Sequence, residues 1–188
     1  MNERLLRAVE SRRDELVTLA SELIQFPTVN PPGEAYTPCA EYIARRLQKH
    51  GFETRLIRGE GTPGDTDRYP RTNVVARREG RAPGAVVHFN SHIDVVEAGE
   101  GWTFDPFAGT VKDGRVYGRG ACDMKGGLAA SIIAAEAFMD VFPDFTGAIE
   151  ISGTVDEESG GFGGVAYLAS KGFFSRPRVD HVIIPEPL

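Results

Sequence analysis

An apolar run that ends in a histidine and an aspartate constrains the fold most strongly. Residues 85–89 (Ala-Val-Val-His-Phe) are typical of a buried strand, and Asn90-Ser91-His92-Ile93-Asp94 follow directly. Residues two apart in a strand point to the same face, and each residue advances the chain by about 3.3 Å. His92 and Asp94 can therefore reach one site, where the imidazole binds a metal ion and the carboxylate holds its other ring nitrogen. The stretch predicts one half of a metal centre.

The size and composition of the chain indicate one globular domain. Its 188 residues suffice for an α/β domain with a sizeable core, and hydrophobic residues make up 41% of them. The net charge of -6, without a basic stripe, argues against nucleic-acid binding. Cys39 and Cys122 are too few and too far apart for a disulfide framework. The chain has no signal-peptide or transmembrane-length apolar run, so we expect a cytoplasmic protein that does not bind membranes.

Helical and strand patterns alternate along the chain, which predicts an α/β fold. The expected helices cover residues 3–25, 38–50, 125–142 and 165–171. The expected strands cover residues 52–58, 72–78, 85–90, 148–155 and 182–184. Asp113-Gly114 indicates a hairpin at residues 111–117, and this hairpin is the reason for expecting a mixed sheet flanked by helices.

Asp123 is the first of three further carboxylate sites. It lies between the glycines of residues 118–120 and 126–127, which permit unusual backbone angles and close approach. Its two oxygens could bridge two cations, which lie roughly 3.5–4 Å apart in two-metal hydrolytic sites. Because a helix is expected to follow, Asp123 is also a favoured N-cap, and this explanation is sufficient for Asp123 taken alone.

The other two carboxylate sites follow predicted strands. Glu157 and Glu158 come after residues 148–155, and Glu186 comes after residues 182–184. Neighbouring residues of an extended chain point in opposite directions, so one glutamate can coordinate a cation while the other acts as a general base. A solvated acidic loop is the plainer alternative. Open α/β sheets bind ligands beyond the carboxyl ends of their strands, and three coinciding strand ends favour the site.

The remaining histidines are expected to lie outside the site. His88 is on the same strand face as His92, but about 13 Å away along the strand, so it should pack in the sheet. His50 lies at the end of a predicted helix, where a partly charged imidazole is favourable. His181 begins a predicted strand, and no function is predicted for it.

Taken together, these motifs resemble the co-catalytic zinc metallopeptidase family, which includes acetylornithine deacetylase, succinyl-diaminopimelate desuccinylase, aminoacylase and carboxypeptidase G. The resemblance covers most of residues 15–188. The stretches that carry it are residues 91–94, 102–107, 117–127, 156–158 and 185–187.

The resemblance implies a site with two Zn²⁺ ions, with Co²⁺ or Mn²⁺ as alternatives. The implied ligands are His92, Asp123, Glu158 and Glu186. His92 and Glu186 would bind one ion, Asp123 would bridge both, and Glu158 would bind the second. The remaining implied roles are a general base, Glu157, and an orienting residue for the histidine, Asp94. The peptide bond after Asp123 is often cis in the family.

The implied activity is hydrolysis of the amide in a small N-acyl amino acid or N-acyl amine by a zinc-activated water. A dipeptidase or carboxypeptidase of the same family is one alternative, and a non-catalytic metal-binding protein is another. Family members are longer and carry a lid and dimerisation domain, followed by a returning segment with a final histidine ligand. We therefore expect residues 1–188 to be the N-terminal part of the catalytic domain and to be inactive alone, with a homodimer as the full-length form.

Overall fold

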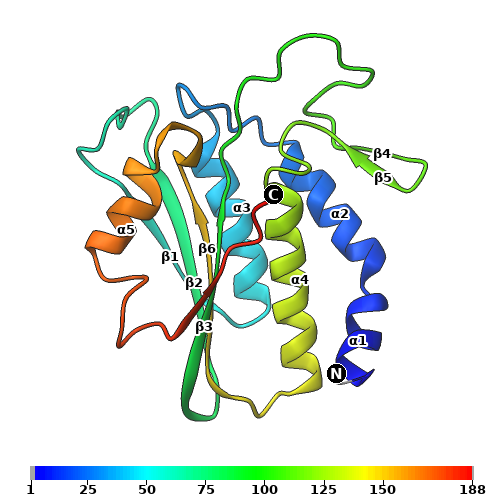
Figure 1. Cartoon of the computed structure of the whole chain (residues 1–188), viewed down its shortest axis with the longest axis vertical. Coiled ribbons are helices and arrows are strands. Elements are labelled where there is room, and N and C mark those ends of the chain that lie inside the picture. Colours follow the sequence, from blue (N-terminus) through cyan, green and yellow to red (C-terminus); the bar gives the residue numbers. More distant parts are fainter. Residues whose placement is uncertain (1–2, 188) are drawn as a thin grey trace.

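The computed structural model describes residues 3–187 and shows a five-stranded sheet with helices on both faces (Figure 1). β3 runs parallel to β6 and β7, whereas β2 runs antiparallel to β1 and β6. The predicted α/β fold with a mixed sheet is therefore confirmed. In spatial order the strands are β1 (Glu53–Arg58), β2 (Thr72–Glu79), β6 (Thr146–Thr154), β3 (Ala82–His92) and β7 (His181–Ile183).

The sheet is mixed because β2 runs antiparallel to both of its neighbours, β1 and β6, and the expectation that the hairpin causes the mixed directions is wrong. β4 (Thr110–Lys112) and β5 (Arg115–Tyr117) form a separate two-stranded sheet. The φ angles of Asp113 and Gly114 are 51° and 73°, as the predicted two-residue turn requires. β1 and β2 are antiparallel because a loop without a crossover helix reverses the chain between them.

The helices agree with the sequence pattern except at the start of the chain. They are α1 (Glu3–Glu10), α2 (Arg13–Ile24), α3 (Tyr36–Lys49), α4 (Lys125–Val141) and the short α5 (Tyr167–Ser170). The helix expected at residues 3–25 is divided at Ser11-Arg12. Arg12 Nη1 lies 3.0 Å from Oε2 of the buried Glu136 in α4, so a tertiary ion pair accompanies the break in the helix.

Helices α3 and α4 pack against one face of the sheet, with α2 against α4, and α5 with the segment after it covers the other face (Figure 1). The larger core lies on the first face and includes the fully buried Leu23, Ile43, Leu128, Ile132 and Ile151. A smaller core on the second face contains Val75, Leu168 and Phe173. No helix within residues 3–187 is both long and apolar enough to cross a membrane.

The second face of the sheet also buries an ion network around Glu150. Its Oε1 lies 2.8 Å from Nη1 of Arg77 and 2.6 Å from Nη2 of Arg178, and its Oε2 lies 2.9 Å from Nδ1 of His88. The expectation that His88 packs in the sheet is confirmed, because its side chain is fully buried. Burial raises the pKa of Glu150, but His88 and the two arginines outweigh this effect and lower the pKa.

Replacing Glu150 should weaken the fold and change its response to acid. We expect Glu150→Gln to lower the free energy of unfolding at pH 7 by about 3 kcal/mol, because two partly buried arginines lose their shared carboxylate. The folded-state pKa lies below the unfolded value, so this stabilisation is present above the ordinary value of 4.5 and is lost as the pH falls through the folded pKa. Urea unfolding below about pH 5 should therefore depend less on pH in the variant. Identical pH profiles would contradict this assignment.

Candidate metal centre

The parallel strands β6, β3 and β7 end at one edge of the sheet, and the predicted site residues follow these ends. His92 is the last residue of β3 and is in register with Thr154, the last residue of β6. A short turn, η1 (Glu157–Ser159), follows β6, and Glu186 follows β7. The topology therefore brings together stretches that are far apart in the chain.

All four predicted ligands meet at this edge. His92, Asp123 and Glu158 each offer one atom, and these atoms lie within 4.8 Å of one another. Nε2 of His92 is 2.9 Å from Oδ1 of Asp123 and 3.7 Å from Oε2 of Glu186. The side chain of His92 is 1% exposed, whereas those of Asp123 and Glu186 are 50% and 40% exposed. The cluster thus has a buried floor and a side that is open to solvent.

Asp123 faces His92 and does not cap the following helix. Helix α4 begins at Lys125, and its N-cap residue, Met124, makes no side-chain capping hydrogen bond. The carboxylate of Asp123 lies instead against Nε2 of His92. The geometry therefore does not support the N-cap explanation. The Asp123–Met124 peptide bond is cis, as the resemblance implied.

The surroundings of His92 determine which ring nitrogen is free to bind an ion. Nδ1 lies 2.9 Å from the carbonyl oxygen of Asp94. A carbonyl oxygen only accepts hydrogen bonds, so Nδ1 carries a hydrogen. In the neutral imidazole Nε2 then presents a lone pair to a carboxylate oxygen of Asp123, and a proton or a cation must lie between these two acceptors. An imidazole nitrogen with several carboxylate oxygens is a donor set that fits a divalent metal ion.

The pKa values at the site show how strongly these groups favour a positive charge. Burial lowers the pKa of His92, but Asp94, Asp123 and Glu186 outweigh it and raise the value to about 9. Burial is the largest cause that raises the pKa of Glu158, and the negative charge of Asp123 is the second. Burial and a hydrogen bond with Asp123 raise the pKa of Glu186. A bound divalent cation would relieve this repulsion between carboxylates.

The carboxylate of Asp94 holds the glutamate turn in addition to its expected contact with His92. It is fully buried and accepts hydrogen bonds from the backbone N–H groups of Glu157 and Glu158, at 3.2 and 3.1 Å. Its Oδ1 lies 3.5 Å from Nδ1 of His92, farther than the Asp94 carbonyl oxygen. The main chain of Asp94 therefore makes the closer contact with the imidazole, while its side chain lies near the imidazole and also binds the turn.

Glu157 and Glu158 lie in a 3-10 turn, and the expectation of an extended backbone is wrong. Asp156, just before the turn, has a φ angle of 63°, and the chain turns away from the direction of β6 at this residue. The carboxylate of Asp94 accepts hydrogen bonds from two successive N–H groups of the turn. In an extended chain these two N–H groups would point to opposite sides. The two glutamates still differ in position, since Glu158 joins the ligand cluster and Glu157 is exposed beside it.

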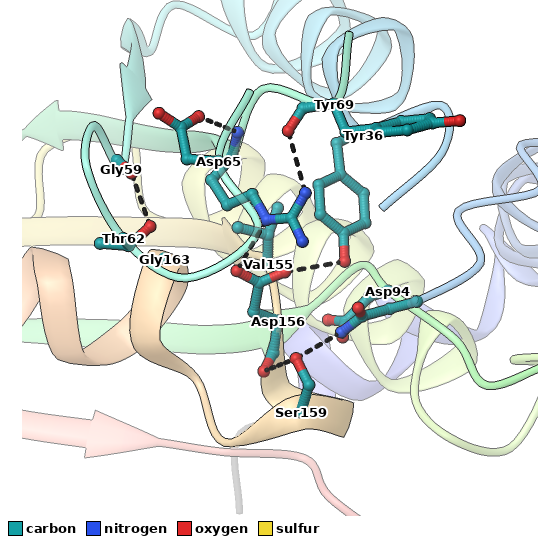
Figure 2. A network of polar contacts seen from close by, with 12 residues as sticks. Tyr36, Gly59, Thr62, Asp65, Tyr69, Asp94, Val155, Asp156, Ser159 and Gly163 are labelled. Carbon is teal, nitrogen blue, oxygen red and sulfur yellow. Dashed lines mark hydrogen bonds and ion pairs between the residues drawn. The ribbon is translucent and has the colours of Figure 1, made fainter. Parts of the chain in front are cut away.

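Sequence reasoning did not identify the buried residues that form hydrogen bonds with Asp156, the residue before this turn. Oδ2 of Asp156 accepts a hydrogen bond from Nε of Arg71, and Oδ1 accepts one from the Tyr36 hydroxyl, both at 3.1 Å. Figure 2 shows Tyr36 directed at Asp156. Burial raises the pKa of Asp156 even though Arg71 opposes this change. Arg71 and Asp156 are 85 positions apart, so no local spacing could have revealed the pair.

Asn30 is a second residue that sequence reasoning missed. Its Nδ2 donates to Oδ2 of Asp94 at 3.0 Å and lies 2.8 Å from Oγ of Ser159. It thereby links the end of β3 to the turn after β6. In the sequence Asn30 precedes Pro31-Pro32-Gly33, a pattern that indicates only a turn after a helix.

A glycine allows Glu186 to approach the site. A β-carbon on Gly127 would lie 2.6 Å from the carbonyl oxygen of Pro185, which is shorter than real contacts of this kind. Glycine is therefore required for the segment before Glu186 to pack against the first turn of α4. Figure 1 shows the C-terminal segment beside the upper end of α4.

The contacts of Asp94 predict an indirect effect on metal binding. Asp94→Asn should weaken Zn²⁺ binding by about 10–100-fold, because an amide in place of one carboxylate oxygen disturbs the turn that carries Glu158. Isothermal titration calorimetry at neutral pH measures the change. Asp113→Asn, in the exposed hairpin turn, is the matched control. Equal affinities for both variants and the unchanged protein would contradict the role assigned to Asp94.

Comparisons with known proteins identify the family of the chain. The model for Peptidase family M20/M25/M40 matches residues 88–188, which is more than half of the chain. The chain therefore belongs to this family, and the resemblance inferred from the motifs is confirmed.

Individual relatives support the same assignment and show how much of them the chain spans. The succinyl-diaminopimelate desuccinylase of Polynucleobacter necessarius is 37% identical over 173 residues, covering 90% of this chain but 43% of that protein. Human carnosine dipeptidase 1 has a similar structure, with a TM-score of 0.82 and 25% identity over 99% of this chain and 41% of its own. A dinuclear metal-binding M20 peptidase from Bacillus subtilis shares the fold, with a TM-score of 0.63 and 18% identity over 93% of this chain and 43% of its own. The chain thus spans less than half the length of these proteins.

Proposed function

We propose that this chain forms the metal-binding part of the active site of an enzyme that hydrolyses the amide of small N-acyl amino acids or N-acyl amines. The observation that carries the proposal is the convergence of an imidazole nitrogen and several carboxylates at the carboxyl edge of the sheet. The buried Asp94 supports the arrangement, because its carboxylate accepts hydrogen bonds from the turn and from Asn30 and lies 3.5 Å from Nδ1 of His92.

Two divalent cations are proposed for the complete site. His92 and Glu186 would hold one cation and Glu158 the other, with Asp123 in contact with both. A mixed set of imidazole and carboxylate ligands suits Zn²⁺, with Co²⁺ or Mn²⁺ as alternatives. Divalent cations held in this way lower the pKa of water and polarise a carbonyl group.

Glu157 is the proposed general base. Its backbone N–H is held by the Asp94 carboxylate, so its position is fixed next to the ligand Glu158. Its side chain is exposed and lies outside the group of three ligand atoms. Glu157 would accept a proton from the attacking water and pass it to the nitrogen of the leaving amine.

The substrate class is proposed from the relatives. The desuccinylase that is 37% identical supports an N-succinyl or related N-acyl substrate. Dipeptide hydrolysis is a second candidate, supported by the structural similarity to carnosine dipeptidase 1. We further propose that residues 1–188 form the N-terminal part of the catalytic domain and are inactive alone. In this proposal additional chain supplies the lid and the last ligand, and the full-length form is a homodimer.

Assays of the full-length protein would test this function. Amine release from N-succinyl, N-acetyl and N-formyl substrates should be measured beside hydrolysis of dipeptides, with and without a chelator. We expect chelator-sensitive hydrolysis of at least one N-acyl amine. Hydrolysis of dipeptides alone would favour the second candidate. A protein that binds two zinc ions but hydrolyses none of these substrates would be a non-catalytic metal-binding protein, and the proposal would then be wrong.

A further inference from the structure

A positively charged cavity lies on the face of the sheet that α5 covers, and it shares no residue with the metal centre. Its volume is about 350 Å³, within the range of small-molecule sites. Three of its lining residues are cationic, two are aromatic and one is aliphatic, and none is acidic. The lining residues are Arg55, Ile57, Tyr167, Lys171, Phe173 and Arg178.

The positive charge of the cavity is only partly neutralised. Nη2 of Arg178 lies 2.6 Å from Glu150, but this carboxylate is also shared with Arg77, at 2.8 Å. Among residues 3–187, neither Arg55 nor Lys171 has a carboxylate oxygen within 4.0 Å. The cations therefore exceed the nearby carboxylates, and the resulting field attracts an anion.

Aromatic rings hold the three cations in place. The guanidinium carbons of Arg178 and Arg55 lie 4.7 and 5.7 Å from the ring centroid of Phe173. Nζ of Lys171 lies 5.1 Å from the ring centroid of Tyr167. These cation–π contacts restrict side chains that would otherwise be mobile, so less conformational entropy is lost when a ligand binds.

We propose that this cavity binds a small organic anion with a planar apolar body. A carboxylate or phosphate group would contact Arg55, Lys171 and Arg178, since a guanidinium offers paired N–H groups to such oxygens. The apolar body would lie against Tyr167 and Ile57, which provide an aromatic and an aliphatic surface in the same cavity. Binding here requires neither a metal ion nor hydrolysis, so the test below is separate from that of the proposed function.

Four probes separate the charge of the ligand from its apolar body. Phenyl phosphate and benzoate carry both features, inorganic phosphate carries charge alone, and benzyl alcohol carries a ring alone. In calorimetric titrations at low salt we expect phenyl phosphate or benzoate to bind at least about tenfold more tightly than the last two probes. Comparing the affinities of phenyl phosphate and benzoate shows whether the cavity prefers a phosphate or a carboxylate group. Equal affinity for benzyl alcohol, or no binding of either aromatic anion at millimolar concentration, would overturn the proposal.

Variants locate the binding in the cavity. Lys171→Ala and Arg55→Ala should each weaken binding of the preferred anion by about fivefold or more, and Lys171→Glu should weaken it further. Arg68→Ala is the matched control, because Arg68 is an exposed arginine 5.1 Å from a tyrosine ring outside the cavity. Arg178 is left unchanged because it also pairs with Glu150. Unchanged thermal melting confirms that the variants fold, and unchanged affinity in folded variants would overturn the proposal.

Discussion

Glu157→Gln in the full-length protein should reduce turnover by about 10²–10⁴-fold and leave the metal content unchanged. Glutamine preserves the size of the side chain but cannot accept the proton of the attacking water. The ligand atoms of His92, Asp123 and Glu158 are grouped without Glu157, so metal binding should persist. The maximal rate of amine release and the metal content of the same preparation are the two quantities to measure.

The combination of these two readouts separates three roles for Glu157. Loss of turnover with full metal content supports the general base. Loss of both would make Glu157 a ligand, and normal turnover would remove it from the mechanism. Glu60→Gln, an exposed glutamate in the loop after β1, provides the control for adding an amide at the surface.

Asp123→Ala should weaken binding of the first metal ion by more than about 100-fold and remove the second ion. Loss of an outer-shell contact alone costs about 10–100-fold, and Asp123 would contact both ions directly. Its Oδ1 is the nearest carboxylate oxygen to Nε2 of His92. Metal content after dialysis and calorimetric titration with Zn²⁺ measure the stoichiometry and the affinity. Two bound ions in the variant would contradict the bridging role.

A second group of potential ligand atoms in the protein provides the control for this experiment. Glu15, His50 and Glu136 also lie within 4.8 Å of one another. Glu136 is fully buried, however, and Arg12 and Arg46 pair with it at 3.0 and 2.7 Å. These arginines already supply the positive charge that a metal ion would bring. Glu15→Ala should therefore leave Zn²⁺ affinity unchanged.

The strand ends explain why the sequence predicts that the candidate ligands lie together. His92, Glu158 and Glu186 each follow an apolar run, and parallel strands place such positions at one edge of the sheet. Asp123 lacks this signal, because its position depends on the turn before α4. Its role was implied by resemblance to the metallopeptidase motifs, and the structure places it against His92.

The supporting contacts could not be predicted because they join residues that are distant in sequence. The Arg71–Asp156 pair and the contacts of Asn30 depend on how loops pack beyond the sheet. The 3-10 turn at Glu157 follows from the hydrogen bonds that Asp94 accepts, which no periodicity reports. In each case tertiary contacts determine a local conformation that the local sequence leaves open.

The most direct test of the metal centre is an anomalous diffraction measurement at the zinc edge, on crystals of the protein grown with Zn²⁺. We predict an anomalous peak within bonding distance, about 2.0–2.2 Å, of Nε2 of His92 and a carboxylate oxygen of Asp123. In the full-length protein a second peak should lie between Asp123 and Glu158. The contradicting result is a metal-loaded crystal in which His92, Asp123 and Glu158 contact no peak, above all if the ion lies instead among Glu15, His50 and Glu136.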